Sequence, residues 1–302
     1  MKNILLIVNP VSGNKKSKII LADVQNKLKS NNMTFKVIET EYKGHIEKIL
    51  KSHNLQTIDC ICIIGGDGSF HEAVNGLMLR EDKLKKPLGI IPAGSGNSLS
   101  RDLNILDPSD SIKALINGKS TPMDIGKIDS DNDVIYSFNI TGWGMVANIG
   151  IKAENYRWLG TSRYTILSLF EILSKNTSFA KITYYNENNK KCYIKDKFMF
   201  AAICNTIHTG KGMKIAPHAK LNDGLMDLVL IKDASRFKLL LLMSKLFNGT
   251  HIENDIVEYI QIKKIELKPK NITKLNIDGE IKGLTPFKLT VMPNQIEIIN
   301  NY

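Results

Sequence analysis

The chain has 302 residues, of which 41 are Lys or Arg and 30 are Asp or Glu, so its formal net charge is +11. Hydrophobic residues make up 43% of the sequence, which excludes a mainly disordered chain, and the length predicts two domains. The lysines are scattered and lack interleaved aromatic residues, so the charge indicates a solvated surface or attraction for small anions and acidic membranes, and disfavours a nucleic-acid partner.

The first part of the chain, residues 1–122, predicts an α/β domain. Apolar runs at 3–9, 33–40, 59–65 and 87–93 alternate with helical spacing at 17–30, 45–53 and 69–79. Near-continuous apolar strands that alternate with helices are typical of a parallel sheet covered on both faces. The glycine-rich segments of this half follow directly after strands, which is where open α/β sheets bind ligands.

The remainder, residues 123–302, predicts a β-sandwich or mixed β domain. Alternating runs occur at 135–145, 179–185, 192–205, 225–231, 256–268, 274–283 and 287–299, with helical spacing at 163–175 and 235–247. The second helix is apolar on nearly all sides, which fits either core packing or the wall of a lipid pocket. The apolar stretches are too short or too charged for a membrane span.

Cysteine usage indicates a reducing compartment. The four cysteines, Cys60, Cys62, Cys192 and Cys204, form no C-x-x-C pair. We therefore expect reduced, buried thiols in a cytosolic protein.

The strongest motif lies in residues 63–77, where an apolar strand runs into Gly65-Gly66-Asp67-Gly68. Ser69 and Glu72 then have the spacing of a helix capping box. Glycine lets the backbone approach an anion closely, and a helix N-terminus attracts it. A carboxylate beside a polyphosphate suits Mg²⁺ binding or proton acceptance, so Asp67 favours phosphoryl transfer. A tight strand-to-helix turn that needs glycine is the structural alternative.

Two further loops have a similar construction. Gly94, Ser95, Gly96 and Asn97 follow the strand at 87–93, and the first strand ends in residues 9–13, Asn-Pro-Val-Ser-Gly. Neither the Walker P-loop nor the dinucleotide fingerprint occurs at these turns. Three strand-end loops of this kind predict one anion site on the sheet edge.

These motifs in this order resemble the diacylglycerol kinase catalytic fold, a family that includes sphingosine kinases and soluble bacterial lipid kinases. The segments G-G-D-G-x-x-x-E-x-x-N-G-L, P-A-G-S-G-N and N-P-x-S-G carry the resemblance, which covers nearly the whole chain. Residues 142–165 and the D-G-E at 278–280 look most like sphingosine kinases, whereas residues 216–228 look like the bacterial enzymes. The implied fold is an NAD-kinase-like doubly wound α/β domain followed by a β-sandwich domain, with the active site in the cleft.

The resemblance implies an ATP- and Mg²⁺-dependent lipid kinase with Asp67 as catalytic aspartate and Glu280 as the second candidate for the base. It implies that ATP contacts Asn9, Thr40, Gly66, Gly68, Glu72, Gly94, Ser95, Gly96, Asn97, Arg157, Arg163 and Asp278. It also implies a structural Mg²⁺ held by Lys220, Asp223 and Leu225, through one carboxylate and two carbonyls, although a simple Asn-Asp-Gly turn explains that segment equally well. Independently of the family, Asp278-Gly279 is an ordinary type I′ hairpin signal.

One departure concerns the acceptor. Sphingosine kinases carry aspartates in the segment that matches residues 146–152, and here those positions are Asn148 and Gly150. A cationic amine gains from an anionic partner, so a diacylglycerol-like or other lipid alcohol stays open beside a sphingoid base.

We therefore expect a cytoplasmic lipid kinase that visits an anionic membrane transiently, and the sequence leaves a homodimer open. Two alternatives remain at this point. One is an NAD kinase, which shares G-G-D-G and the two-domain plan; the other is a catalytically silent lipid-binding regulatory protein.

Overall fold

The computed structural model describes residues 2–15, 17–94, 96–131, 133–156, 158, 162–210 and 212–301, and it divides into two compact units. The first unit contains residues 1–123 and 294–302, and the second contains residues 124–293. The sequence assigned the last nine residues to the second domain. In the structure they group with the first unit, where Ile298 pairs in parallel with Leu88.

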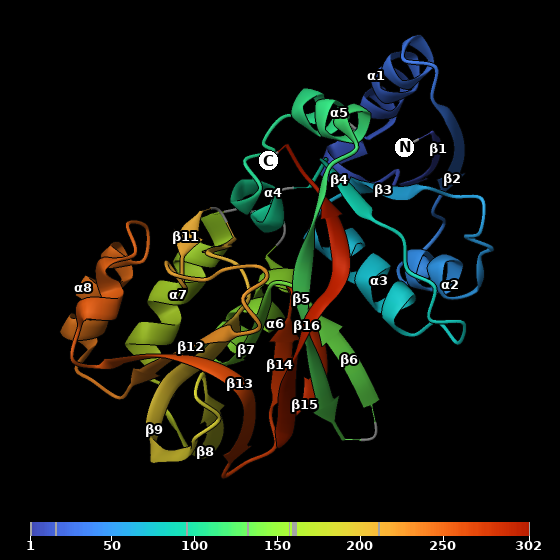
Figure 1. Cartoon of the computed structure of the whole chain (residues 1–302). Helices are drawn as coiled ribbons and strands as arrows, with labels where there is room; N and C mark the ends of the chain where they lie inside the picture. Colours follow the sequence, from blue (N-terminus) through green and yellow to red (C-terminus); the bar gives the residue numbers. More distant parts are fainter. Residues whose placement is uncertain are drawn as a thin grey trace. The chain divides into compact units, whose positions relative to one another are not determined.

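The first unit is built on a parallel sheet of order β2-β1-β3-β4. Its strands are β1 (Asn3–Val8), β2 (Thr34–Glu39), β3 (Cys60–Gly65) and β4 (Leu88–Pro92). Its helices are η1 (Ser12–Lys15), α1 (Ser17–Ser30), α2 (His45–Ser52), α3 (Asp67–Met78), α4 (Ser98–Asp102) and α5 (Pro108–Asn117). Helix α1 packs with α5 and α2 packs with α3, and the two pairs cover the sheet (Figure 1). The predicted doubly wound α/β arrangement is confirmed.

The second unit is rich in strands. These are β5 (Ser120–Ser130), β6 (Asp133–Ser137), β7 (Ile140–Gly144), β8 (Ser178–Asn186), β9 (Lys191–Cys204), β10 (His208–Thr209), β11 (Met213–Lys214), β12 (Met226–Lys232), β13 (Val257–Pro269), β14 (Lys274–Ile277), β15 (Glu280–Leu284) and β16 (Phe287–Ile299). Its helices are α6 (Met145–Asn155), α7 (Ser162–Ser174), α8 (Arg236–Lys245) and η3 (Thr250–Glu253). Strands β5 and β16 begin or end in the first unit.

Two long strands turn this sheet into a sandwich. The first half of β9 pairs with β8 and its second half with β7 and β12, while β13 pairs first with β12 and then with β8 and β16. Along β9, Ala201 and Ile203 face the core between the layers, whereas Ala202 and Cys204 face a second core that includes residues of α6, α7 and α8. Because both faces of the second half of β9 are covered, residues 198–204 are apolar and buried at every position.

The second half contains elements that the sequence pattern did not separate. The expected strand at 135–145 consists of β6, β7 and the first residue of α6, with a break at residues 138 and 139. Helix α6 was not expected, because its sequence continues the apolar run of the preceding strand. Among the residues that the structure describes, no helix combines the length and the apolar character needed to cross a membrane.

The four cysteines are unpaired thiols, and Cys60, Cys62 and Cys204 are buried. Burial raises the pKa of Cys60 to about 12 and keeps the pKa of Cys62 well above its ordinary value.

We expect one thiol, the partly exposed Cys192, to react quickly with a chromogenic thiol reagent at pH 8 in the native protein, and four thiols to react in denaturant. Two or more rapidly reacting thiols in the native protein would contradict the burial of Cys60, Cys62 and Cys204.

Candidate functional site

Three loops at the carboxyl ends of parallel strands pack against one another through their backbones. A Cβ atom at Gly94 would lie 2.5 Å from Cα of Gly66, and one at Gly13 would lie 2.1 Å from the carbonyl oxygen of Ala93. The amide of Ala93 also donates to the carbonyl of Gly65 at 2.9 Å. Only glycine permits these approaches, so the glycines of the separate motifs are required to assemble a single backbone surface.

Asn97 holds the third loop in shape. Its Oδ1 accepts from the amide of Gly94 at 3.2 Å, and its Nδ2 donates to the Gly94 carbonyl at 2.9 Å. Gly96 lies between these two residues, whereas Ser95 lies outside the described residues. The amide pair of Asn97 thereby closes a small ring at the end of β4.

Asp67 is the first residue of α3, and its carboxylate reaches the start of α4. Its Oδ1 and Oδ2 accept from the amide of Ser98 at 2.9 and 3.1 Å, and Ser98 Oγ lies 3.3 Å from Oδ2. Gly68 is the second residue of the same helix. The carboxylate is therefore fixed beside two helix N-termini, an environment that favours negative charge.

The expected capping box of Ser69 and Glu72 is wrong. Helix α3 begins two residues earlier than the pattern indicated, and its N-cap, Gly66, makes no side-chain capping bond. Ser69 Oγ instead accepts from Nδ2 of Asn9 at 3.2 Å, which joins the first loop to the second. This contact uses the Asn9 side chain, one of the residues expected to bind nucleotide.

Glu72 caps a different helix. Its carboxylate accepts from the amides of Gly44 at 2.8 Å and Ile46 at 3.2 Å, at the start of α2. The same connection begins at Thr40, which is buried at the end of β2 and donates its amide to the Val8 carbonyl at 2.9 Å. Glu72 therefore ties α3 to the loop that carries Thr40.

In the second unit, Asp278 occupies the turn between β14 and β15. Asp278 and Gly279 both have positive φ, 54° and 93°, and Ile277 pairs with Glu280 across the turn, so the predicted type I′ hairpin is confirmed. Glu280, the first residue of β15, is partly exposed.

The carboxylate of Asp278 is buried and binds the break between β6 and β7. Oδ1 accepts from Ser137 Oγ at 2.8 Å and from the amides of Asn139 and Ile140 at 2.9 Å, and Oδ2 accepts from the Phe138 amide at 3.1 Å. Such a carboxylate anchors a loop. This structural use of Asp278 was not anticipated from the sequence.

Arg157 lies outside the described residues. Arg163, the second residue of α7, stacks its guanidinium 4.8 Å from the ring centre of Tyr164, and Nη2 donates to that hydroxyl at 3.1 Å. Its Nε is buried without a hydrogen-bond partner in the described part of the chain. A cation in the first turn of a helix opposes the helix dipole, so local helix stability does not explain it.

The segment from Lys220 to Leu225 was expected to bind a structural Mg²⁺. In the structure it forms an Asn-Asp-Gly turn, which was the alternative explanation. Asp223 Oδ1 accepts from the Leu225 amide at 3.1 Å, and Asp124 Oδ2 accepts from the Gly224 amide at 2.6 Å. The Asp223 side chain keeps a second oxygen, which together with the carbonyls of Lys220 and Leu225 is a hard donor set that fits Mg²⁺. The ion itself stays a prediction.

Nearby, burial raises the pKa of Asp227 to about 6, with a smaller contribution from the charge of Asp223. No cluster of three His, Cys, Asp or Glu suited to a metal occurs among the described residues.

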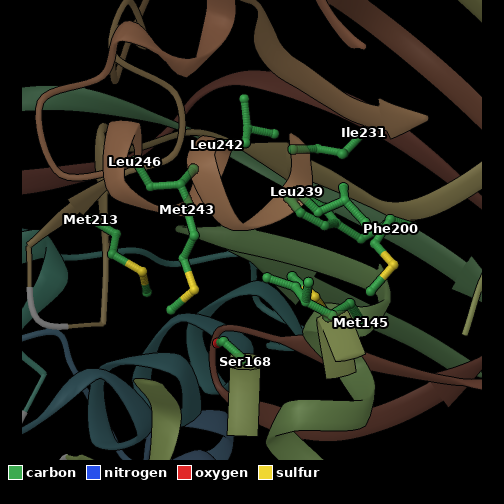
Figure 2. Close-up of a pocket in the computed structure, with 11 residues that line it drawn as sticks. Met145, Ser168, Phe200, Met213, Ile231, Leu239, Leu242, Met243 and Leu246 are labelled. Atoms are coloured by element: carbon green, nitrogen blue, oxygen red, sulfur yellow. The ribbon is translucent and has the colours of Figure 1, made fainter. Parts of the chain in front are cut away.

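An apolar cavity of about 30 Å³ lies wholly within the second unit (Figure 2). It is lined by residues of α6, α7, α8 and the sheet: Met145, Ser168, Ile172, Met199, Phe200, Met213, Ile231, Leu239, Leu242, Met243 and Leu246. Ser168 is the one polar side chain in this lining, and four of the others are methionines, which repack easily. The apolar helix expected near 235–247 thus contributes to a cavity wall. The other lining residues were not identified from the sequence, because folding alone brings them together.

Comparison with known proteins assigns both halves. Residues 3–128 match the model of the diacylglycerol kinase catalytic domain, and residues 139–300 match that of the YegS C-terminal NAD kinase beta sandwich-like domain. The chain is 28% identical to sphingosine kinase 1 of Arabidopsis thaliana over 89% of this chain, and it spans only 64% of that relative. It is 27% identical to the diacylglycerol kinase of Bacillus subtilis, with 99% of this chain and 96% of that protein aligned.

A crystal structure of a candidate diacylglycerol kinase from Bacillus anthracis str. Sterne has the same fold, with a TM-score of 0.81 at 23% identity over 99% of this chain and 97% of that one.

The hydrogen bonds of Asp278 predict that its replacement lowers the free energy of unfolding much more than a change at Glu280, two residues away. Asp278→Ala leaves Ser137 Oγ and three amides without their acceptor, so we expect a loss of about 3 kcal/mol in the free energy of unfolding by urea. The matched change Glu280→Gln, at a partly exposed side chain, should cost less than about 0.5 kcal/mol. Equal losses in the two variants would show that Asp278 does not hold the β6–β7 break.

Proposed function

Since this chain belongs to the lipid kinase family that combines a diacylglycerol kinase catalytic domain with a YegS C-terminal NAD kinase beta sandwich-like domain, we propose that it phosphorylates a membrane lipid alcohol with ATP. The observation that carries the proposal is the backbone contact between Gly66 and Gly94, which assembles the strand-end loops around Asp67. Such a surface suits a polyphosphate because it offers amides and no side chains that would exclude it.

In the proposed complex the nucleotide lies on the first unit. Asn9, Thr40 and the two glycine loops, Gly66–Gly68 and Gly94–Asn97, surround it, and Glu72 acts indirectly by holding the Thr40 loop to α3. Arg157 and Arg163 would neutralise phosphate charge. The buried Nε of Arg163, which has no hydrogen-bond partner in the described part of the chain, supports that role because it leaves a donor for an anion.

The proposed step is a direct transfer. The lipid hydroxyl oxygen forms a bond to the γ-phosphorus of ATP, the bond from that phosphorus to the ADP oxygen breaks, and the hydroxyl proton passes to a carboxylate. Asp67 is our first candidate for the base, because its carboxylate is fixed among the loops by Ser98. Glu280 is the second; Asp278 beside it serves to position the hairpin.

Bound Mg²⁺ would offset the charge of the transferred phosphoryl group. Asp67 on the first unit is our candidate ligand for such an ion, and Glu280 is the corresponding candidate on the second unit. The turn at Lys220, Asp223 and Leu225 would hold a separate, structural ion.

The lipid side of the reaction belongs to the second unit. The methionine-lined cavity is small, so an acyl chain would enter only as α8 and the methionine side chains shift outward. Helices α7 and α8 pack together, and large apolar side chains are exposed on them and just after α8: Leu169, Phe170, Leu173, Phe237, Leu241 and Phe247. Arg236, Lys238 and Lys245 belong to the same α8. We propose that this apolar and basic surface, the α7–α8 face, touches an anionic membrane transiently.

Asp67→Asn tests the catalytic proposal. Asn keeps an oxygen that can accept from the Ser98 amide, so it removes the charge and the base with less disturbance than alanine, which would also remove the contact to α4. We expect transfer of ³²P from ATP to fall by about a thousandfold or more, with an unchanged circular dichroism spectrum.

Asp23→Asn, an exposed residue of α1, is the matched control and should retain activity. A panel of sphingoid bases, ceramide, mono- and diacylglycerols and NAD as acceptors separates the alternatives. Phosphorylation of NAD would favour an NAD kinase. Lipid binding without any labelled product would favour a non-catalytic lipid-binding protein.

The α7–α8 face predicts vesicle binding. The double change Phe237→Gln and Leu241→Gln removes two exposed apolar side chains and no charge, so affinity for phosphatidylcholine–phosphatidylglycerol vesicles should fall by about tenfold in a flotation assay. Tyr193→Gln removes an exposed ring on β9 and should have no effect. Unchanged binding of the double variant would refute the proposed surface.

A further inference from the structure

The outward face of four paired strands in the second unit is rich in lysine. Ala180 and Ile182 of β8 and Leu267 of β13 point into the core, so the residues that alternate with them point outward. The pairing of β9 with β8, of β8 with β13 and of β13 with β16 brings these outward side chains into rows. We call this surface the lysine face after its members Lys181, Lys191, Lys195, Lys264, Lys268 and Lys288.

Lysines stand directly opposite one another on this face. Lys181 of β8 pairs with Lys195 of β9 on one side and with Lys268 of β13 on the other. Like charges opposite each other across strands lower the stability of a sheet. Among the described residues of these rows the acidic one is Glu266, whose carboxylate lies 3.0 Å from Lys268 Nζ and 3.7 Å from Lys288 Nζ. Lys181 and Lys195 are exposed, so packing does not account for their placement, and the face keeps a net positive charge.

The charges are spread over an area and not along a line. Neighbouring strands lie about 4.8 Å apart and alternate residues of one strand about 6.7 Å apart, so the rows cover roughly 14 Å in each direction. A nucleic-acid strand follows one track of charges, whereas a bilayer presents its anionic head groups as a plane. None of the chain's five arginines lies on these strands, and lysine is a hydrated point charge without the planar fork that reads phosphates and bases. The face therefore suits a plane of anionic lipids.

The lysine face adjoins the α7–α8 face. Lys197, one step along β9 from this face, accepts at its carbonyl from the amide of Asp233 at 2.9 Å, and Asp233 leads into α8. Lys175, directly after α7, forms an ion pair of 3.1 Å with the Asp233 carboxylate. Phe179 lies opposite Lys197 and is exposed, as is Leu173 of α7. The charged strands and the apolar helices thus meet at one edge of the second unit.

Extending the membrane contact of the proposed function, we propose that the lysine face docks on anionic lipid head groups while the α7–α8 face supplies apolar contact. Its ammonium groups attract the membrane through water over about 10 Å and need not enter the lipid. The simpler role of these lysines is to keep the protein in solution. That role requires no partner, and it predicts that vesicle binding does not depend on them.

The experiment is vesicle flotation of the full chain, with the double variant Lys181→Gln and Lys195→Gln. Its affinity for phosphatidylcholine–phosphatidylglycerol vesicles at about 0.1 M salt should fall by about tenfold or more, because two charges near the anionic surface are lost. Its binding to vesicles of phosphatidylcholine alone should equal that of the wild type. The variant removes a pair of opposed like charges, so its midpoint of unfolding in urea should be no lower than that of the wild type.

Two control variants separate position from charge. Lys29→Gln with Lys51→Gln removes the same net charge from exposed positions on α1 and α2, and its affinity should stay within about threefold of the wild type. Tyr193→Gln changes an uncharged side chain of the lysine face, and it should leave affinity unchanged because the attraction is electrostatic.

Unchanged flotation of the Lys181 and Lys195 variant on the anionic vesicles would overturn the inference, as would an equal loss in the Lys29 and Lys51 control. A labelled single-stranded RNA whose binding needs Lys181 and Lys195, while vesicle binding does not, would assign the face to nucleic acid and overturn it as well. Flotation involves no phosphoryl transfer. Lysine-dependent flotation of a protein that labels no lipid would therefore refute the proposed kinase activity and leave this inference intact.

Discussion

The contact on which the first unit depends is the approach of two backbones, Gly66 against Gly94. With a Cβ atom on either residue the loops after β3 and β4 would be forced apart, and Asp67 would lose its bond to the Ser98 amide. The remaining contacts extend from this point: Asn97 closes the loop after β4, Asn9 reaches Ser69, and the Ala93 amide bonds to Gly65. The absence of side chains is here the structural requirement, and it also leaves amides for an anion.

In the second unit, the charged side chain of Asp278 fixes a loop. The strand is interrupted between β6 and β7, which leaves three successive amides for another acceptor. The Asp278 carboxylate accepts hydrogen bonds from all three. A carboxylate in a sequence motif is readily assigned to metal or substrate. Here Asp278 is buried and accepts hydrogen bonds from four groups, so its role in this structure is to hold a loop. Glu280, two residues later, is partly exposed.

The sequence pattern predicted those elements whose interactions are local in the chain, and it missed side chains whose hydrogen-bond partners lie far away in the sequence. The strands of the first unit were predicted to within about one residue and α1 at its observed bounds, because burial on both faces produces uninterrupted apolar runs. The glycine loops were found for the same reason, since each directly follows its strand. Glu72 and Glu171 were misassigned or missed because their partners lie 19 to 28 residues away on other elements. Helix α6 was missed because its local pattern continues that of β7.

The size and lining of the cavity determine how it could be filled. A space of about 30 Å³ lined by apolar side chains and one hydroxyl offers a water molecule few hydrogen-bond partners. An apolar chain that entered it would displace no ordered water, and its gain there would come from dispersion contacts with the polarizable thioethers. The opposing cost is the separation of α8 from the sheet beneath it. Uptake of an apolar ligand there would therefore be coupled to loosening of α8, because packing contacts would be gained with the ligand and lost between the helix and the sheet.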